Sequence, residues 1–531
     1  MLDVLISGGV VYDGSGVEGR RVDVGVQGDR IVAIGALRDS EARLRLMAEG
    51  RAVCPGFVNI LSHSYLSILH DPRSMGELSQ GVTTQVFGEG ISMGPLTSPT
   101  RKEIEELGRE WGVEVCWTSL AEYLLHVESR GSSQNVASFV AAGTLRANVV
   151  GYQDRPATAR EVDQMRSLVE EAMADGAVGV SSALIYPPGS YADTEELTAL
   201  CSAAAKFGGV YSSHLRDEGA GLLGAADELI QICRNAGLPG EIYHLKAAGI
   251  GNWPLMEQVI DRIEEARSGG DSISADVYPY TASATGLTTV IPQRFHAGGS
   301  EALYDRLGDP AVRAEIRSEL EAEGRFGDVS DAESVLILSM RTSAGREYQG
   351  CTLAKVAAMR GQDPIEAALG LIAEDRTRVG AAFFSISEDN LASALLRPWV
   401  AVCSDGSSMA PEGLFLKSPT HPREYGSFAR VLGRYVREQR LLPLSEAIRR
   451  MSCLPATKLG LRDRGTLREG SFADIVVFDP ATVADRSTFA DPHQLSVGVD
   501  HVLVNGQLTL SGGQFTGKLA GRALAGPGKS A

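Results

Sequence analysis

Two patterns of apolar and polar residues alternate along the central part of the chain. Short apolar runs predict buried parallel strands, and each is followed by a stretch with apolar residues at helical spacing. The expected strands are FVNILSH, TTQVFGE, SFVAAG, GAVGVSS, VYSSHL, EIYHLK, SISADVYP and WVAVCSD. The expected helices between them include 159–176, 194–208, 221–237 and 253–270. Eight strand–helix repeats with strands buried on both faces favour an α/β fold with a closed (β/α)₈ TIM barrel over an open sheet.

The two ends of the chain show a different pattern. Residues 1–55 and 464–525 alternate apolar and polar residues and carry Gly, Asp and Asn between the runs, which predicts short strands and turns. We expect both ends to pair into one small β-sandwich. Residues 56–290 and 376–463 then form the barrel, and the charged, helical stretch 291–375 is an insertion before the last barrel strand.

Composition narrows the class of partner and compartment. A formal net charge of −17 disfavours nucleic acid and anionic membranes as partners. The chain has no apolar run of about 18 residues, the length that spans a bilayer. Seven scattered cysteines without a C-x-x-C pair, and an N-terminus without a secretory pattern, predict a soluble protein of the cytoplasm. The oligomeric state stays open.

Polar residues with metal-binding chemistry stand where five of the predicted strands end. These residues are His63, Glu89, His214, His244 and Asp405. In a (β/α)₈ barrel the carboxyl ends of all strands meet at one rim, and imidazole with carboxylate suits zinc or a similar divalent metal. A single such residue is more often a hydrogen-bonded histidine or a helix cap, but five on one rim predict a metal site.

Several motifs, in this order, give the chain a resemblance to the D-aminoacylases, the N-acyl-D-amino-acid deacylases of the amidohydrolase superfamily. The motifs are VCPGFVN (53–59), QGVTT (80–84), GEGISMGP (88–95), SHLRDEG (213–219), HLKAAG (244–249), DVYPYTAS (276–283), SDG (404–406), HPRxYGSF (421–428) and GxFADIVVFDP (470–480). The resemblance implies a metal-dependent hydrolase that cleaves the amide bond of an N-acyl amino acid, with a D-amino acid expected.

The same resemblance implies roles for four of the rim residues. His214 and His244 would be the two histidine ligands of the metal. Glu89 stands where many D-aminoacylases have a metal-bridging cysteine, and a carboxylate is an acceptable zinc ligand. Asp405 would be the general base and acid, which takes a proton from a metal-activated water and passes it to the leaving amine.

The chain departs from the family at the first strand. The family pattern P-G-F-x-D-x-H-x-H holds a second metal, but here Asn59 replaces the acid and Leu61 replaces the first histidine. Leucine has no lone pair to donate, so we expect one zinc per chain, or another divalent metal, bound by Glu89, His214 and His244. His63 is then free to support the oxyanion.

An N-acyl amino acid carries a free carboxylate, so the substrate is expected to be a small molecule that needs cations and hydroxyls in the pocket. The resemblance points to Lys246, Arg423 and a tyrosine of the Y-P-Y segment, Tyr278 or Tyr280. Tyr186 is a further candidate. Arginine is the better bidentate partner of a carboxylate, and lysine acts as a point charge.

Two other functions remain open at this point. A tailoring enzyme of a biosynthetic pathway could use the same metal site on a different amide, on a cyclic substrate or in a carbon–carbon cleavage. A pseudoenzyme could keep the barrel for binding alone.

Overall fold

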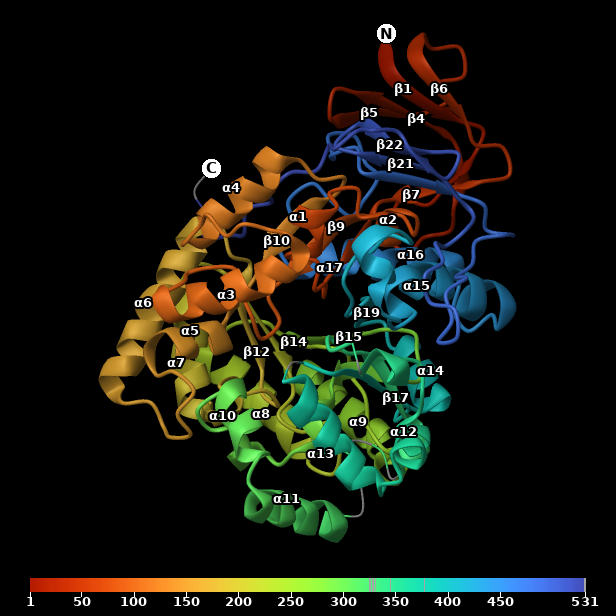
Figure 1. Ribbon diagram of the computed structural model, residues 1–531. Coiled ribbons are helices and arrows are strands. Elements are labelled where there is room, and N and C mark those ends of the chain that lie inside the picture. Colours follow the sequence, from red (N-terminus) through yellow and green to blue (C-terminus); the bar gives the residue numbers. More distant parts are fainter. Residues whose placement is uncertain (324–325, 327–328, 330, 344, 377, 530–531) are drawn as a thin grey trace.

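The computed structural model describes residues 1–323, 326, 329, 331–343, 345–376 and 378–529. The strands of both chain ends lie together at the top of Figure 1, and the helices α10 to α13 lie at the opposite end of the molecule. The parallel strands lie between these two parts. The architecture is α/β.

All eight predicted central strands are present and run parallel. They are β8 (Phe57–Asn59), β9 (Val82–Phe87), β10 (Asn135–Ser138) continued by β11 (Val140–Ala141), β12 (Gly179–Ala183), β13 (Val210–His214), β14 (Gly240–Ile242), β15 (Ile273–Val277) and β19 (Val400–Val402). Each pairs with its neighbours in this order. A parallel bridge between Ser62 and Gly406 joins the segment after β8 to the segment after β19, so the strands form a ring.

The helices between the strands follow the predicted apolar spacing. The four predicted ones are α6 (Ala159–Asp175), α7 (Thr194–Ala205), α8 (Leu222–Ala236) and α9 (Leu255–Ser268). In α6, Thr158 and Glu161 form a capping box, which satisfies amide groups at the helix start. Its apolar face, with Met165 and Val169, is fully buried, so the packing of this face holds the helix against the rest of the protein.

Further helices lie outside these four repeats. They are α1 (Ser67–His70), α2 (Met75–Leu78), α3 (Ser98–Trp111), α4 (Leu120–Arg130), α5 (Ala142–Val149), α14 (Glu388–Leu395), α15 (Arg423–Arg430), α16 (Leu444–Met451) and α17 (Cys453–Lys458). Among the described residues no helix is long and apolar enough to cross a membrane.

The two chain ends share one β-sheet. Its strands, in order, are β23 (Gln514–Phe515), β22 (Gln507–Ser511), β21 (Val499–Val504), β20 (Ile475–Phe478), β7 (Ala52–Pro55), β2 (Val10–Val11) and β3 (Arg20–Arg21). A second sheet contains β5 (Arg30–Gly35), β4 (Asp23–Gln27), β1 (Leu2–Ser7) and β6 (Ala42–Met47). One apolar cluster includes Val24 of the second sheet and Ile475 of the first, so the two sheets pack together.

A third part has its own sheet and its own apolar cluster. The antiparallel strands are β16 (Ser283–Gly286), β18 (Gly380–Phe383) and β17 (Val335–Ser339), accompanied by α10 (Ser300–Arg306), α11 (Pro310–Glu323), α12 (Leu353–Arg360) and α13 (Pro364–Asp375). Two of the strands fall outside the predicted range 291–375. Their sequences, SATG and GAAF, are short and rich in small residues, so they carry no clear strand pattern.

Asp474 connects the shared sheet to the parallel ring. Its Oδ1 accepts the backbone amide of Asn505 (2.8 Å), and its Oδ2 accepts Asn135 Nδ2 (3.2 Å) at the start of β10. The guanidinium of Arg464 donates to the same carboxylate, and both side chains are buried. A buried charge whose partner is removed is strongly destabilising.

We therefore expect Asp474→Ala to lower the free energy of unfolding by about 3–5 kcal/mol, because Arg464 loses its buried partner. Urea denaturation would measure this change. Asp163→Ala is the matched control, since Asp163 pairs with Arg166 on the exposed surface of α6, and we expect a change of about 0.5 kcal/mol or less. Equal effects of the two substitutions would show that Asp474 is not a structural link.

Candidate metal centre

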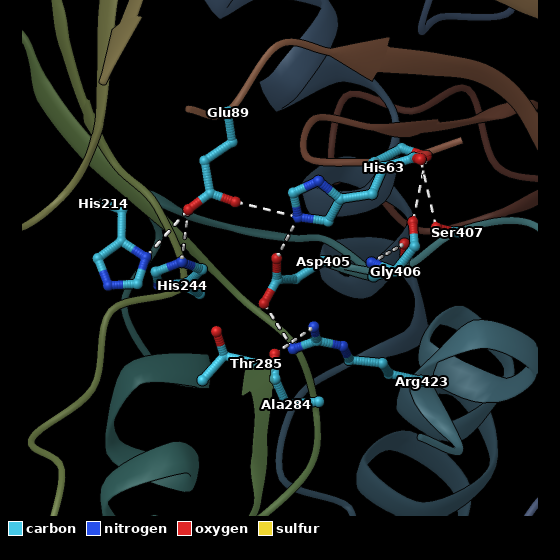
Figure 2. A network of polar contacts seen from close by, with 12 residues as sticks. His63, Glu89, His214, His244, Ala284, Thr285, Asp405, Gly406, Ser407 and Arg423 are labelled. Atoms are coloured by element: carbon cyan, nitrogen blue, oxygen red, sulfur yellow. Dashed lines mark hydrogen bonds and ion pairs between the residues drawn. The ribbon is translucent and has the colours of Figure 1, made fainter. Parts of the chain in front are cut away.

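The five predicted rim residues converge on one cluster (Figure 2). Glu89 Oε1 lies 3.0 Å from His214 Nδ1 and 3.2 Å from His244 Nε2. Glu89 Oε2 lies 3.1 Å from His63 Nε2, which is 3.0 Å from Asp405 Oδ1. The cluster therefore contains three imidazoles and two carboxylates, contributed by five separate segments of the chain.

The backbone turns sharply at three of the segments that supply these residues. His244 and Asp405 have φ angles of 37° and 50°, a left-handed conformation that is unfavourable for residues with a side chain. Gly88 has φ 122°, and a Cβ there would lie 2.8 Å from the carbonyl oxygen of Phe139. The turn that presents Glu89 thus requires glycine. The predicted strand EIYHLK stops at Ile242, before His244 turns inward.

Three of the clustered residues match the ligand set of a divalent metal. The ligand atoms of Glu89, His214 and His244 lie within 4.8 Å of one another, and all three residues are buried. Two imidazole nitrogens and one carboxylate oxygen are the three-ligand set of many catalytic zinc sites. His63, Glu89 and Asp405 form a second group that shares Glu89.

The buried carboxylates of the cluster favour positive charge on the groups around them. Burial would lower the pKa of His63, but its hydrogen bonds to Asp405 and Glu89 raise it to about 9. Burial and Lys246 would lower the pKa of His244, yet nearby carboxylates raise it to about 10. Burial would raise the pKa of Glu89, whereas the imidazoles hold it well below its usual range. Protons on these imidazoles compensate the buried carboxylates, and a divalent cation can replace them.

Glu218 lies behind both candidate histidine ligands, and the sequence patterns did not single it out. Its Oε2 is 3.4 Å from His214 Nε2, and its Oε1 is 3.1 Å from His244 Nδ1. In both histidines the other ring nitrogen points to Glu89. Lys246 Nζ donates to Glu218 Oε1 at 2.6 Å. The one sequence signal was its position, four residues after His214 in SHLRDEG.

Arg423 and Tyr278 lie beside the cluster. Arg423 Nη1 donates to Asp405 Oδ2 at 2.5 Å, and its guanidinium carbon lies 5.0 Å from the centre of the Tyr278 ring. The Tyr278 ring is also 6.1 Å from the His244 ring. These contacts bring a cation and a phenol to the same side of Asp405, where Figure 2 places Arg423.

The other two predicted tyrosines differ in position. The Tyr186 ring lies edge-on to His214, with 5.6 Å between ring centres, and its hydroxyl is 2.7 Å from Thr285 Oγ1. Tyr280 instead donates to the carbonyl oxygen of Pro422 at 3.3 Å and packs against His421. The described contacts therefore bring Tyr186 to the cluster but not Tyr280.

The residues that depart from the family pattern have structural contacts. Leu61 is fully buried in an apolar cluster with Val86. Asn59 Nδ2 donates to Glu77 Oε1 and to Ser404 Oγ, each at 2.7 Å. Burial raises the pKa of Glu77 to about 8, although the hydrogen bonds that Glu77 accepts from Ser404 and Asn59 oppose the rise. Asn59 thus joins β8 to the segment after β19 and offers no charge to a metal.

The cluster of metal-binding residues at the strand ends indicates a metal-dependent hydrolase. Comparison with known proteins agrees with this class. The family described as "Amidohydrolase family" matches residues 339–510. The chain is 35% identical to the D-aminoacylase of Alcaligenes xylosoxydans xylosoxydans, over 98% of this chain and 97% of that protein. It is also 35% identical to the N-acyl-D-glutamate deacylase of the same organism, over 95% of this chain and 93% of that protein.

A solved structure shows the same similarity in three dimensions. It is the N-acyl-D-glutamate deacylase of Bordetella bronchiseptica, complexed with zinc and a phosphonate inhibitor that mimics the tetrahedral intermediate. The TM-score is 0.83 at 32% identity, and the match covers 99% of each chain. The chain is an amidohydrolase. Within that class it belongs to the D-aminoacylase family.

We expect Glu218→Gln to weaken zinc binding about 10–100-fold, because outer partners that orient metal-ligating histidines have effects of this size. Competition with a chromophoric chelator would measure the dissociation constant. Glu195→Gln changes an exposed carboxylate at the start of α7 and should leave it unchanged. Zinc binding that is equally tight in both variants would mean that Glu218 does not orient the ligands.

Proposed function

We propose that this protein is a zinc-dependent N-acyl-D-amino-acid deacylase. The observation that carries the proposal is the convergence of Glu89, His214 and His244, with Asp405 next to them. The curated relatives supply the substrate class, since their names specify deacylation of N-acyl-D-amino acids. A role in binding alone would not need a buried ligand set with an acid beside it.

The finer architecture is part of the same proposal. We interpret the ring of parallel strands as a (β/α)₈ barrel, in which chemistry belongs at the carboxyl ends of the strands. The two sheets of the chain ends, 1–55 and 464–525, would form the composite β-sandwich. The third part would extend from Ser283 to Phe383, the outer limits of its sheet.

A zinc ion held by Glu89, His214 and His244 would lower the pKa of a water molecule and polarise the scissile carbonyl. Asp405 would accept the proton of the attacking water and donate it to the leaving amine. Burial alone would raise the pKa of Asp405. The charges of Arg423 and His244 lower the pKa by a larger amount, so it lies below its usual value. The carboxylate is thus ionised at neutral pH and ready to act as a base.

His63 and Lys246 complete the proposed reaction centre. His63 donates to Asp405 when protonated and could release this contact to support a developing oxyanion. Lys246 is buried, and its ammonium lies 2.7 Å from His244 Nδ1. His63 lies close enough to the cluster to stabilise negative charge as the amide is attacked, and Lys246 keeps its predicted role as a cation for the substrate carboxylate.

Arg423 would bind the α-carboxylate of the substrate, together with Tyr278. In the structure Arg423 Nη1 donates to Asp405, and Arg423 Nη2 donates to the carbonyl oxygen of Ala284 at 3.2 Å. Arginine can hold a carboxylate with two parallel hydrogen bonds. Tyr186 would contribute to the opposite wall through its place beside His214. The contacts of Tyr280 give it no such role.

One zinc per chain is the stoichiometry that the residues support. A second metal would have to use His63, Glu89 and Asp405. Leu61 adds no ligand to that group, and Asp405 is already neutralised by Arg423. The guanidinium of Arg423 therefore already compensates the negative charge of Asp405, which a second metal ion would otherwise have to compensate.

The cellular setting is also a proposal. All seven cysteines are free, which fits a reducing compartment such as the cytoplasm. We expect a small-molecule partner with a carboxylate and no nucleic acid partner, because the net charge is −17.

We expect Asp405→Asn to reduce kcat for N-acetyl-D-amino acids about 10²–10⁴-fold, because a general base and acid contributes an effect of this size. KM should change only a few-fold. Steady-state kinetics with a panel of D- and L-substrates would measure this, with zinc content as the control for an intact site. A kcat close to wild type would contradict the role of Asp405.

Elemental analysis after dialysis against zinc should give one zinc per chain. Glu89→Ala should bring the zinc content close to zero, because it removes a carboxylate ligand from the three-ligand set. His63→Ala should retain the full content, since His63 is outside that set. Two zinc ions in the wild type, with half lost in His63→Ala, would instead establish a two-metal site.

A further inference from the structure

Two carboxylates that the proposed reaction does not use lie buried next to the segment that carries Asp405. Glu77 of α2 and Glu424 of α15 are 1% and 9% exposed, and Oε2 of each has no hydrogen-bond partner in the described part of the chain. Neither carboxylate forms an ion pair with a lysine, arginine or histidine among these residues. Ionised carboxylates are costly in such surroundings, so the pair is expected to carry less than its full negative charge.

Both carboxylates lie close to Gly406, the residue after Asp405. Glu77 Oε1 accepts a hydrogen bond from Ser404 Oγ at 3.0 Å, and the backbone amide of Gly406 donates to the same Ser404 Oγ at 3.2 Å. Glu424 Oε2 would lie 2.9 Å from a Cβ placed on Gly406. Gly406 therefore contacts Glu424 directly and is connected to Glu77 through one hydroxyl group.

The turn at Gly406 determines the position of Asp405. Asp405 has a left-handed backbone conformation, with φ 50°, so its side chain follows any movement of the turn. The carbonyl oxygen of Gly406 accepts the backbone amide of His63 at 2.9 Å, and both residues lie beside Asp405 in Figure 2. Arg423, which donates to Asp405, directly precedes Glu424 in the chain. A shift of Gly406 or Glu424 would therefore change the contacts of Asp405 with His63 and Arg423.

Helix α2 packs closely against both α15 and the segment after β19. The amide of Glu77 donates to Ser408 Oγ at 3.3 Å, and the amide of Gly76 donates to the carbonyl oxygen of Met409 at 2.7 Å. A Cβ on Gly76 would lie 2.8 Å from the carbonyl oxygen of Glu424. Because these contacts leave little room, Glu77 and Glu424 can move apart only if the packing around the turn opens.

The surroundings of the two carboxyl groups favour their protonated forms. Burial raises the pKa of Glu77 to about 8, and the charge of Glu424 acts in the same direction. Burial also raises the pKa of Glu424 to about 7, where Asp405 adds to the rise and the charges of Arg423 and His63 oppose it. Two carboxyl groups that interact titrate as a pair, because the loss of one proton makes the second harder to remove. One proton is therefore expected to remain on the pair at neutral pH.

We propose that Glu77 and Glu424 share one proton and thereby position Asp405, and that loss of this proton at alkaline pH displaces the turn at Gly406. The positioning of Asp405 rests on its proposed role in deacylation. With the proton present, one carboxyl group donates a hydrogen bond to the other, and their Oε2 atoms gain the partners that they otherwise lack. Without it, two like charges repel each other inside the protein. Both residues are positioning residues, because they act on Asp405 through the backbone.

The test uses the zinc-loaded protein and Glu77→Gln, whose amide group can donate to Glu424 at every pH while its oxygen still accepts Ser404. In wild type, kcat for an N-acetyl-D-amino acid should fall about tenfold from about pH 7 to about pH 9, because a small displacement of a catalytic group is costly in rate. Glu77→Gln should lose only about two-fold over the same range, since its hydrogen bond does not depend on a proton that can be lost. KM should change little in either protein.

A second measurement follows the proton without turnover. An unfolded chain releases a glutamate proton near a pKa of about 4.3, whereas the native pair retains one. This contribution to stability is therefore fully present below about pH 4 and is lost as the pH rises through about 8. In urea denaturation between about pH 5 and about pH 7, the folding constant of wild type should fall about tenfold per pH unit more steeply than that of Glu77→Gln. Glu195→Gln removes an exposed carboxylate and should keep the wild-type slope.

The two measurements separate the parts of the inference. Equal pH slopes of unfolding in wild type and Glu77→Gln would overturn the shared proton, and different slopes with identical kinetic profiles would overturn the positioning of Asp405. Where Glu77→Gln does not fold, Glu424→Gln provides the same comparisons, since its amide can donate to Glu77. A zinc-loaded wild type that cleaves no N-acetyl-D-amino acid at any pH would refute the deacylase function, and the unfolding measurement would still decide whether the pair holds a proton.

Discussion

The burial of several carboxylates in one place is the constraint on which the site depends. Glu89, Asp405 and Glu218 are each less than 10% exposed, and an ionised carboxylate away from water is costly unless opposite charge compensates it. The structure supplies that charge on every side, with imidazoles between Glu89 and Glu218, Lys246 against Glu218 and Arg423 against Asp405. Part of that compensation comes from protons on the imidazoles, and a divalent cation bound by the same side chains can replace these protons.

The two histidine ligands are held from both sides. Glu89 contacts one ring nitrogen of each imidazole, and Glu218 faces the other nitrogen. Such a carboxylate behind a ligand determines the tautomer and the orientation of the ring. Because Glu218 also contacts Lys246, the position of this lysine is coupled to that of the metal ligands. The left-handed backbone at His244 and Asp405 is an unfavourable conformation that these contacts help to maintain.

Different parts of the molecule contribute different aspects of the proposed function. The ends of the parallel strands supply the reacting groups, which belong to a rigid framework of paired backbone. The third part supplies Thr285 of β16, whose Oγ1 lies 2.7 Å from the hydroxyl of Tyr186, the tyrosine beside His214. Leu61, which stands in place of the first-strand histidine, packs in an apolar cluster.

The sequence by itself determined the order of strands and helices and the five residues that meet at the strand ends, because period and strand polarity are local properties that residue patterns report directly. The tertiary structure alone decided which side chains touch. Glu218 reached both histidine ligands from the segment that follows β13. Tyr280 was separated from the cluster by its contact with Pro422. Contacts between residues far apart in the chain depend on how the segments fold back in space, which no local pattern records.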